Sequence, residues 1–219
     1  MRSKLKRFAE NAEAANVIQP GKPLFEKIKG HWHELYFKNK NPLTVEMACG
    51  RGEYTTGLAR LFPQRNYVGV DIKGDRIWKG ARLARQEGMQ NVAFLRILIH
   101  HVLDYFAENE VDEIWLTFPD PQPKDRHEKR RLTHPRFLDM YKVILQPDGW
   151  LRFKTDNTGL FTYTLEVLQA RPDIRDLTYT FDLYDSPLQA EHYGITTRYE
   201  QMFAEQGEKI KYLKFRFKD

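Results

Sequence analysis

Four carboxylates in this sequence stand at the ends of short apolar runs. Glu46, Asp71, Asp120 and Asp156 each close or follow a β-prone segment. Because the carboxyl ends of parallel strands meet at one edge of a sheet, we expect these side chains to form a row along that edge. Carboxylates in such a row accept hydrogen bonds from ribose hydroxyls and attract cationic groups. The row therefore predicts a site for a nucleoside-like ligand.

The turn after the first apolar run has the composition of a ligand-binding loop. Its small residues Ala48, Gly50 and Gly52 let a ligand approach the backbone closely. Asp71 follows Glu46 by twenty-five residues, and a carboxylate at the end of the next strand can take both hydroxyls of a ribose. The alternative interpretation is a tight turn that holds no ligand.

The same turn favours one cofactor over another. A pyrophosphate site needs the pattern Gly-x-Gly-x-x-Gly, whereas Tyr54 and Thr55 follow Gly52 here. Glu46 would repel a phosphate but attract a cation. S-adenosylmethionine has no phosphate and carries both a sulfonium and an ammonium. The loop therefore predicts S-adenosylmethionine, and its spacing argues against an NAD-dependent oxidoreductase.

A proline-rich segment presents Asp120, and a basic run follows it. Three prolines between residues 118 and 124 fix the backbone and remove hydrogen-bond donors. Residues 124–131 then contain five cations and two carboxylates. A basic cluster beside a ligand cleft suits the phosphate backbone of a nucleic acid, although most charge runs are solvated loops. We therefore expect this segment to bind RNA.

Strands and helices are expected to alternate along the chain and to position these residues. The expected strands are 43–48, 67–70, 92–95, 113–118, 149–154 and 211–217. The expected helices are 54–61, 75–87, 102–107, 135–144 and 158–170. Such alternation predicts an α/β, doubly wound, mostly parallel sheet with helices on both faces. Residues 43–219 form the predicted domain, and residues 1–42 a basic N-terminal extension that is either partly helical or a solvated tail.

Composition excludes several classes of protein. The chain has 219 residues, 41% of them hydrophobic, and a net charge of +5, which is compatible with a polyanionic partner. Its single cysteine, Cys49, excludes a disulfide framework and a cysteine-ligated zinc site. We expect no bound metal, no membrane segment and a cytoplasmic location.

The proline-basic segment resembles a family signature. Residues 118–132, Phe-Pro-Asp-Pro-Gln-Pro-Lys-Asp-Arg-His-Glu-Lys-Arg-Arg-Leu, look like the signature of bacterial tRNA (guanine-N7-)-methyltransferases. Other family segments have counterparts in order at Glu46, at residues 154–156 and at residues 197–200. The resemblance covers residues 43–217.

The resemblance implies a class I methyltransferase fold with a seven-stranded sheet. It also implies transfer of a methyl group from S-adenosylmethionine to N7 of a guanine in the tRNA variable loop. It carries over cofactor contacts at Glu46, Gly50, Asp71, Leu98 and Asp120, of which Asp120 is also the expected catalytic residue. It carries over substrate contacts at Lys124, Asp156, Thr197, Arg198, Tyr199 and Glu200, and RNA contacts at Arg126, Lys129, Arg130 and Arg131.

The sequence departs from the family pattern at a few positions. Ala48 replaces the first glycine of the cofactor loop, and Leu98 stands where many members have an acid near the adenine. Gln122 replaces a frequent tryptophan, and Arg198-Tyr199 replaces Lys-Phe. These changes affect details of the pocket and leave the expected reaction intact.

Two other functions fit parts of the pattern. One is a methyltransferase for another substrate, which the basic run disfavours. The other is a non-catalytic RNA-binding subunit with a vestigial cofactor site, which intact carboxylates at Glu46, Asp71 and Asp120 disfavour. The sequence leaves open the oligomeric state, monomer or homodimer, and the set of tRNAs modified.

Overall fold

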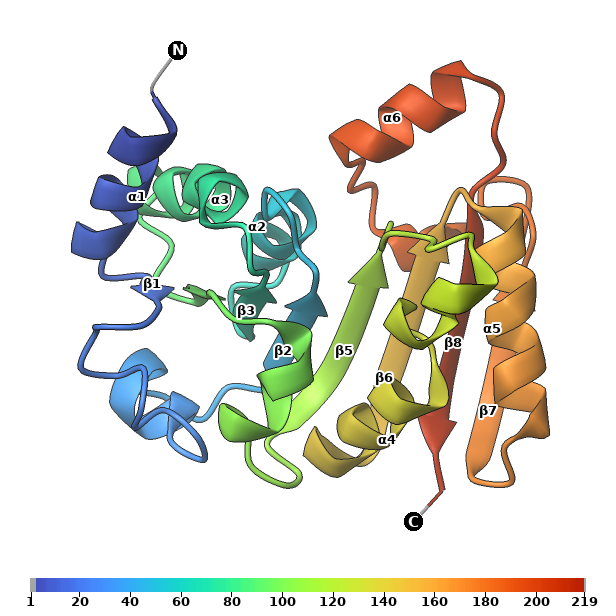
Figure 1. Ribbon diagram of the computed structural model, residues 1–219, viewed down its shortest axis with the longest axis horizontal. Coiled ribbons are helices and arrows are strands. Elements are labelled where there is room, and N and C mark those ends of the chain that lie inside the picture. Colours follow the sequence, from blue (N-terminus) through green and yellow to red (C-terminus); the bar gives the residue numbers. More distant parts are fainter. Residues whose placement is uncertain (1–2, 219) are drawn as a thin grey trace.

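The computed structural model describes residues 3–218, which form one twisted sheet between two layers of helices (Figure 1). The sheet order is β1-β4-β3-β2-β5-β6-β8-β7. The strands are β1 (Val17–Ile18), β2 (Leu43–Met47), β3 (Asn66–Val70), β4 (Val92–Leu95), β5 (Val111–Thr117), β6 (Leu145–Thr155), β7 (Ile174–Thr180) and β8 (Lys211–Phe217). Every pair from β1 to β6 is parallel, whereas β8 runs antiparallel to both β6 and β7.

Helices connect the strands and cover both faces of the sheet. The α-helices are α1 (Lys4–Glu13), α2 (Glu53–Leu61), α3 (Gly74–Gln86), α4 (Pro135–Ile144), α5 (Thr158–Ala170) and α6 (Arg198–Glu205). Short helical turns are η1 (Trp32–Phe37), η2 (Ile99–Asp104), η3 (Asp125–Arg130) and η4 (Gln189–His192). None of the helices within residues 3–218 has the length and apolar character needed to cross a bilayer.

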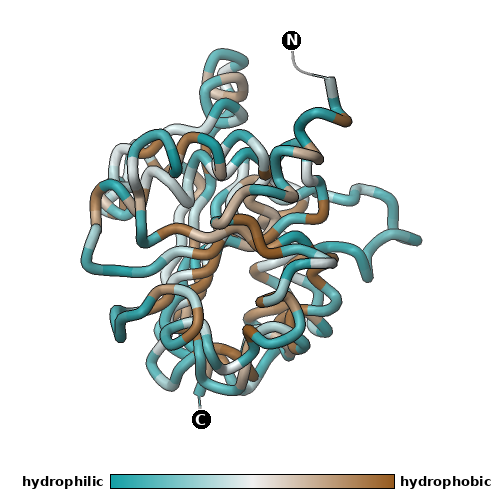
Figure 2. Tube along the Cα trace, turned by 90° about the vertical axis from the view of Figure 1, so that its left-hand side faces the viewer, coloured by the Kyte–Doolittle hydropathy of each residue, from teal (hydrophilic) through white to brown (hydrophobic). Residues whose placement is uncertain are grey.

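The core is split by the sheet into two layers. Along β5, Ile114 and Leu116 pack on the face covered by α4 and α5, whereas Trp115 packs on the face covered by α2 and α3. This alternation follows from the two-residue period of a strand. Figure 2 shows the hydrophobic residues concentrated along the central strands and hydrophilic residues on the outer helices and loops. The predicted doubly wound α/β fold is thus confirmed.

The expected number of strands was wrong, because the sheet has eight rather than seven. The added strand β1 pairs with the outer edge of β4, where Phe94 N–H donates to the Asn16 carbonyl at 2.8 Å and Arg96 N–H to the Ile18 carbonyl at 2.9 Å. These bonds satisfy backbone groups that an open sheet edge would leave unpaired. Strand β7 at the other edge was also missing from the expected elements, since its sequence lacks a regular apolar alternation.

The segment before β2 packs against the domain rather than forming a solvated tail. Ile28 and Trp32 are fully buried in the core on the α4 and α5 face. The Trp32 ring stacks on Phe106 at a centroid distance of 5.3 Å, and its indole N–H donates to the Tyr105 carbonyl at 2.9 Å. The expected helix within residues 102–107 is replaced by the 3₁₀ turn η2, which leads into this contact. The boundary at residue 42 stays a prediction.

Candidate functional site

A hollow of about 660 Å³ lies at the carboxyl ends of β2, β3 and β5. This size suits a small-molecule ligand, for which pockets of roughly 300–1,000 Å³ are usual. Of the expected cofactor residues, Glu46, Gly50, Asp71 and Asp120 line it; of the expected substrate residues, Asp156, Thr197 and Tyr199 do. Seven residues from distant parts of the sequence are therefore brought together at the predicted edge of the sheet.

Glu46 lies at the bottom of this pocket and is almost fully buried. One carboxylate oxygen accepts hydrogen bonds from the Thr55 N–H at 2.9 Å and from the Thr55 hydroxyl, and the other accepts from the Thr117 hydroxyl. Burial raises the pKa of Glu46 to about 7, against the lowering effect of these hydrogen bonds and with a smaller contribution from the nearby charge of Asp71. The carboxylate is fixed in one orientation, with its charge poised near neutral pH.

The loop between β2 and α2 turns through three residues with left-handed backbone conformations. They are Ala48 at φ 58°, Gly50 at φ 55° and Gly52 at φ 69°. Asp71 braces the loop, because its carboxylate accepts from the Gly50 N–H at 2.9 Å and from the Lys73 N–H at 2.8 Å. A side chain at Gly52 would meet the Phe94 ring at 2.5 Å, so this position requires glycine.

Asp120 is presented by a strained segment at the end of β5. Phe118 adopts a left-handed conformation at φ 49°, which is costly for a bulky residue, and its N–H donates to the Lys154 carbonyl at 2.8 Å. The Asp120 carboxylate accepts from the Gln122 N–H at 3.1 Å and is otherwise exposed. Asp120 thus keeps acceptor capacity for a ligand.

Helix α6 overhangs the pocket and is anchored by a buried ion pair. The Nζ of Lys154 and the Oε1 of Glu200 lie 2.7 Å apart, and both side chains are fully buried. Glu200 also accepts from the Tyr184 hydroxyl and, in a capping box, from the Thr197 N–H at 3.3 Å. Desolvation lowers the pKa of Lys154, against the raising effect of Glu200. Glu200 has no surface open to a substrate here, so its expected substrate contact stays a prediction.

The remaining expected residues lie outside the pocket lining. Leu98 precedes η2 and is 49% exposed. Lys124, Arg126, Lys129 and Arg130 are exposed on or beside η3. Arg131 is held within the protein, because its guanidinium stacks over Tyr163 at 4.3 Å and donates to the Gln122 carbonyl at 3.3 Å. The basic run therefore adjoins the Asp120 segment without entering the pocket.

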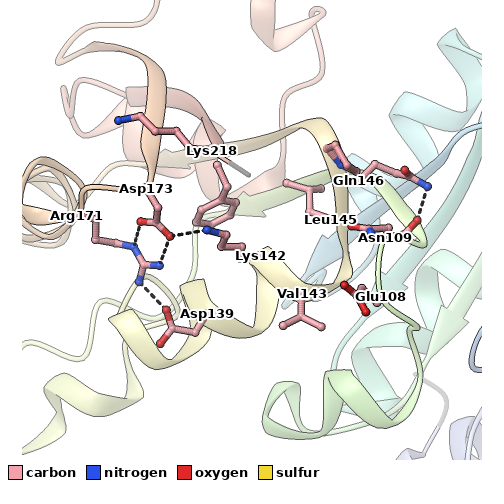
Figure 3. A pocket seen from close by; sticks show the side chains of 12 residues that line it. Glu108, Asn109, Asp139, Lys142, Val143, Leu145, Gln146, Arg171, Asp173 and Lys218 are labelled. Carbon is pink, nitrogen blue, oxygen red and sulfur yellow. Dashed lines mark hydrogen bonds and ion pairs between the residues drawn. The ribbon is translucent and has the colours of Figure 1, made fainter.

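A second hollow, of about 570 Å³, opens near the C-terminal ends of α4, α5 and β8 (Figure 3). Its cations have partners within the protein. Arg171 donates to Asp173 at 2.8 and 2.9 Å and to Asp139 at 2.7 Å, and Lys142 donates to Asp173 at 3.2 Å. Lys218 donates to a backbone carbonyl at 2.8 Å. Because its cations already have partners, they are not available to bind an anionic ligand.

The sequence reasoning missed Thr55 and Thr117, which hold Glu46. Thr117 could have been found, because it is a polar residue at the end of a buried strand, as the four carboxylates are. In the sequence, Thr55 indicates only that the loop does not suit a dinucleotide. The ion pair between Lys154 and Glu200 had no local signal, because its partners are separated by forty-six positions. Across residues 3–218, His, Cys, Asp and Glu side chains nowhere gather in a group able to hold a metal ion.

Comparison with known sequences identifies the family. A family model described as "Putative methyltransferase" matches residues 40–213. A tRNA (guanine-N(7)-)-methyltransferase from Cytophaga hutchinsonii is 51% identical, with 99% of this chain and 98% of the relative covered. Another from Christiangramia forsetii is 44% identical, with 99% of each chain covered. The chain belongs to the tRNA (guanine-N7-)-methyltransferase family.

Solved structures of methyltransferases share the fold of this family member. The 16S rRNA methyltransferase KamB superposes with a TM-score of 0.64 at 14% identity, covering 93% of this chain and 99% of that one. A 16S rRNA (adenine(1408)-N(1))-methyltransferase with cosubstrate SAM from Catenulisporales acidiphilia gives 0.57 at 15% identity, covering 87% and 91%. At such identities the likeness concerns the class I methyltransferase fold alone.

Proposed function

We propose that this chain transfers the methyl group of S-adenosylmethionine to N7 of a guanine in the variable loop of tRNA. The observation that carries the proposal is the convergence of Glu46, Asp71 and Asp120 on one pocket whose rim continues into the exposed basic run. Family membership supports the reaction. The choice of the variable loop follows from the family resemblance of the proline-basic segment.

The residues of the pocket fit the methyl donor. S-adenosylmethionine supplies an electrophilic methyl group on a sulfonium and carries an ammonium and a ribose. Glu46 faces the pocket as a buried acceptor that an ammonium would neutralise. Asp71 keeps lone pairs for ribose hydroxyls beside its two backbone bonds, since a carboxylate has about four acceptor sites. Gly50 leaves the loop open, because nothing lies within 4 Å of a Cβ placed there.

Methylation at N7 needs placement rather than a general base. N7 carries a lone pair and no proton, so in-line positioning near the methyl group can lower the barrier by several kcal/mol. Asp120 and Asp156 accept hydrogen bonds from the N1–H and the exocyclic amine of guanine. Both lie on the pocket wall, and their charges favour the positive charge that develops on the purine ring.

The base has to leave its stack to enter the pocket, as for other enzymes that modify a base. Lys124, Arg126, Lys129 and Arg130 then hold the flanking phosphates. Thr197, Arg198 and Tyr199 at the start of α6 contact the guanosine or its neighbours, while Glu200 positions this helix from below. Because modification of tRNA takes place where tRNA is found, we infer a cytoplasmic location.

The proposal is tested by nucleoside analysis of unmodified tRNA incubated with the protein and methyl donor. Absence of 7-methylguanosine would overturn it. We expect Asp120→Ala and Asp156→Ala to reduce turnover by about 10²-fold or more, as the loss of a charge-stabilising group does. Asp104→Ala is the matched control, because Asp104 is exposed and its ion-pair partner within residues 3–218 is the exposed His101. Near-normal turnover in both site variants would reject the assigned roles. A parallel assay with small-molecule acceptors tests the alternative of a different substrate.

A further inference from the structure

Cations gather on the opposite side of the pocket from η3. Arg51, Lys73 and Arg76 line that side of the pocket itself. Arg51 continues with Lys79 and Arg82 into an adjoining hollow of about 310 Å³ between α2 and α3. These five residues are called the α3 surface below. Lys73, Arg76, Lys79 and Arg82 recur at every third position along α3 and the residue before it, and the fold adds Arg51 from the loop before α2.

The α3 surface has an excess of positive charge. Among residues 3–218, none of its five cations forms an ion pair with a carboxylate. Glu53, the carboxylate that lines the smaller hollow, accepts from the Arg198 N–H at 2.9 Å, and Asp75 lies in the first turn of α3. Partial desolvation, and then the charges of Arg51 and Arg198, lower the pKa of Lys79. Crowded like charges of this kind favour binding of a polyanion.

Helix α1 extends this positive region. The guanidinium groups of Arg7 and Arg82 lie over the Trp78 ring at 5.2 and 5.4 Å, so cation–π contacts hold both in place. Lys4 and Lys6 are exposed on the same helix. Figure 1 shows that α1 and α3 flank the carboxyl edge of the sheet on one side, with α6 on the other.

We propose that the α3 surface binds phosphate groups of the tRNA on the side of the pocket opposite η3. This inference rests on the proposed tRNA substrate. Helix α3 follows β3, and η3 follows β5 and contacts α5 through the Tyr163–Glu128 hydrogen bond at 3.0 Å. The pocket lies between them, at the ends of β2, β3 and β5. The RNA backbone leads away from an inserted nucleotide in two directions. Cations of the α3 surface on one side and of η3 on the other can then neutralise the phosphates of both strand segments.

The test uses Lys79, which is exposed and does not line the pocket. We expect tRNA affinity to fall about threefold in Lys79→Gln and about tenfold in Lys79→Glu, with the slope of log affinity against log salt smaller by about 1. Lys29→Glu is the matched control, because Lys29 is exposed and lies at the end of the sheet opposite the pocket. The next residue, Gly30, donates its N–H to Glu110, which directly precedes β5. The control should bind tRNA as the unmodified protein does.

Two further measurements separate this role from others. Calorimetric affinity for S-adenosylmethionine should be unchanged in Lys79→Glu, and in methyl transfer the KM for tRNA should rise while kcat stays the same. If Lys79→Glu binds tRNA with wild-type affinity and salt slope, the α3 surface does not bind tRNA phosphates, whether or not 7-methylguanosine forms. If the wild-type protein binds tRNA but forms no 7-methylguanosine, the proposed reaction is wrong. The tRNA affinities of the wild-type protein and of Lys79→Glu then still test whether the α3 surface binds phosphates.

Discussion

At the scale of single residues, Glu46 combines burial with a charge that the proposed ligand requires. Its hydrogen bonds with Thr55 and Thr117 lower the pKa, but burial prevails and raises it to about 7. Because the folded protein holds the proton more tightly than the unfolded chain, this group stabilises the fold most below its unfolded value of 4.5 and loses that contribution as pH rises towards 7. The same rise in pH creates the anion that attracts an ammonium.

Binding of S-adenosylmethionine should therefore depend on pH through Glu46. We expect affinity to fall by up to about tenfold per pH unit below pH 7, as the carboxylate is protonated. In Glu46→Gln, affinity at high pH should fall by about 10- to 100-fold, the usual cost of a charge-assisted hydrogen bond, and the dependence near pH 7 should disappear. Calorimetric titration across pH measures both effects. An identical pH profile in the variant would show that another group is responsible.

Ala48 occupies a backbone conformation that suits glycine. At φ 58° its Cβ is crowded by the following carbonyl, which costs roughly 1 kcal/mol in an L-residue. Ala48→Gly removes this strain but gives the unfolded chain more freedom. We expect the free energy of unfolding to rise by about 0.5 kcal/mol, as measured by chemical denaturation. A loss of stability would mean that the Ala48 methyl group contributes packing that outweighs the strain.

At the scale of elements, α6 is the part of the pocket wall that depends most on a remote contact. Thr197 and Tyr199 line the pocket from its first turn. The helix is held through Glu200, whose ion pair with Lys154 joins it to the end of β6. A buried pair contributes modestly when complete, but the loss of one partner leaves an uncompensated charge.

Glu200→Gln should lower the free energy of unfolding by about 3 kcal/mol, because Lys154 remains buried without its counter-charge. Amide hydrogen exchange in α6 should become faster, and methyl transfer should slow as Thr197 and Tyr199 lose their positions. Replacing both partners with apolar residues, Lys154→Met with Glu200→Leu, should restore most of the stability. If exchange in α6 is equal in all three proteins, the pair does not anchor the helix.

At the scale of the whole molecule, the N-terminal segment completes the sheet and the core. Strand β1 covers the edge of β4, and Ile28 and Trp32 fill the layer beneath η2. Burial of large apolar side chains contributes about 1.5–3 kcal/mol each, whereas a whole domain is stable by only about 5–15 kcal/mol.

A chain shortened to begin at residue 43 should therefore lose cooperative unfolding. It lacks Ile28 and Trp32, and it exposes Phe106 and the edge of β4. A chain beginning at residue 15 is the control, since it loses α1 but keeps β1 and Trp32, and we expect it to fold with reduced stability. Thermal unfolding followed by circular dichroism compares the two. A cooperative transition near the wild-type temperature in the shorter chain would show that residues 43–219 fold independently.

Local patterns in the sequence are enough to predict the alternation of strands and helices and the location of the pocket. Helices α4 and α5 and strand β8 have the predicted bounds, because their polarity patterns are local and the N-caps His134 and Asn157 directly precede the two helices. Glu46, Asp71 and Asp120 were placed at one edge of the sheet by a rule that applies to any parallel sheet. The prolines and cations of residues 118–132 indicated RNA binding because they are adjacent in the sequence.

Features that join residues far apart in the chain become visible only in the folded protein. The eighth strand required an edge to pair with, which only the completed sheet provides. The lowered pKa of Lys154 and the raised pKa of Glu46 both follow from desolvation, a property of the packed protein rather than of a sequence pattern. The α3 surface likewise gains Arg51, and its place beside the pocket, from the fold. Coulomb interactions act through space, so their result appears only once the chain has folded.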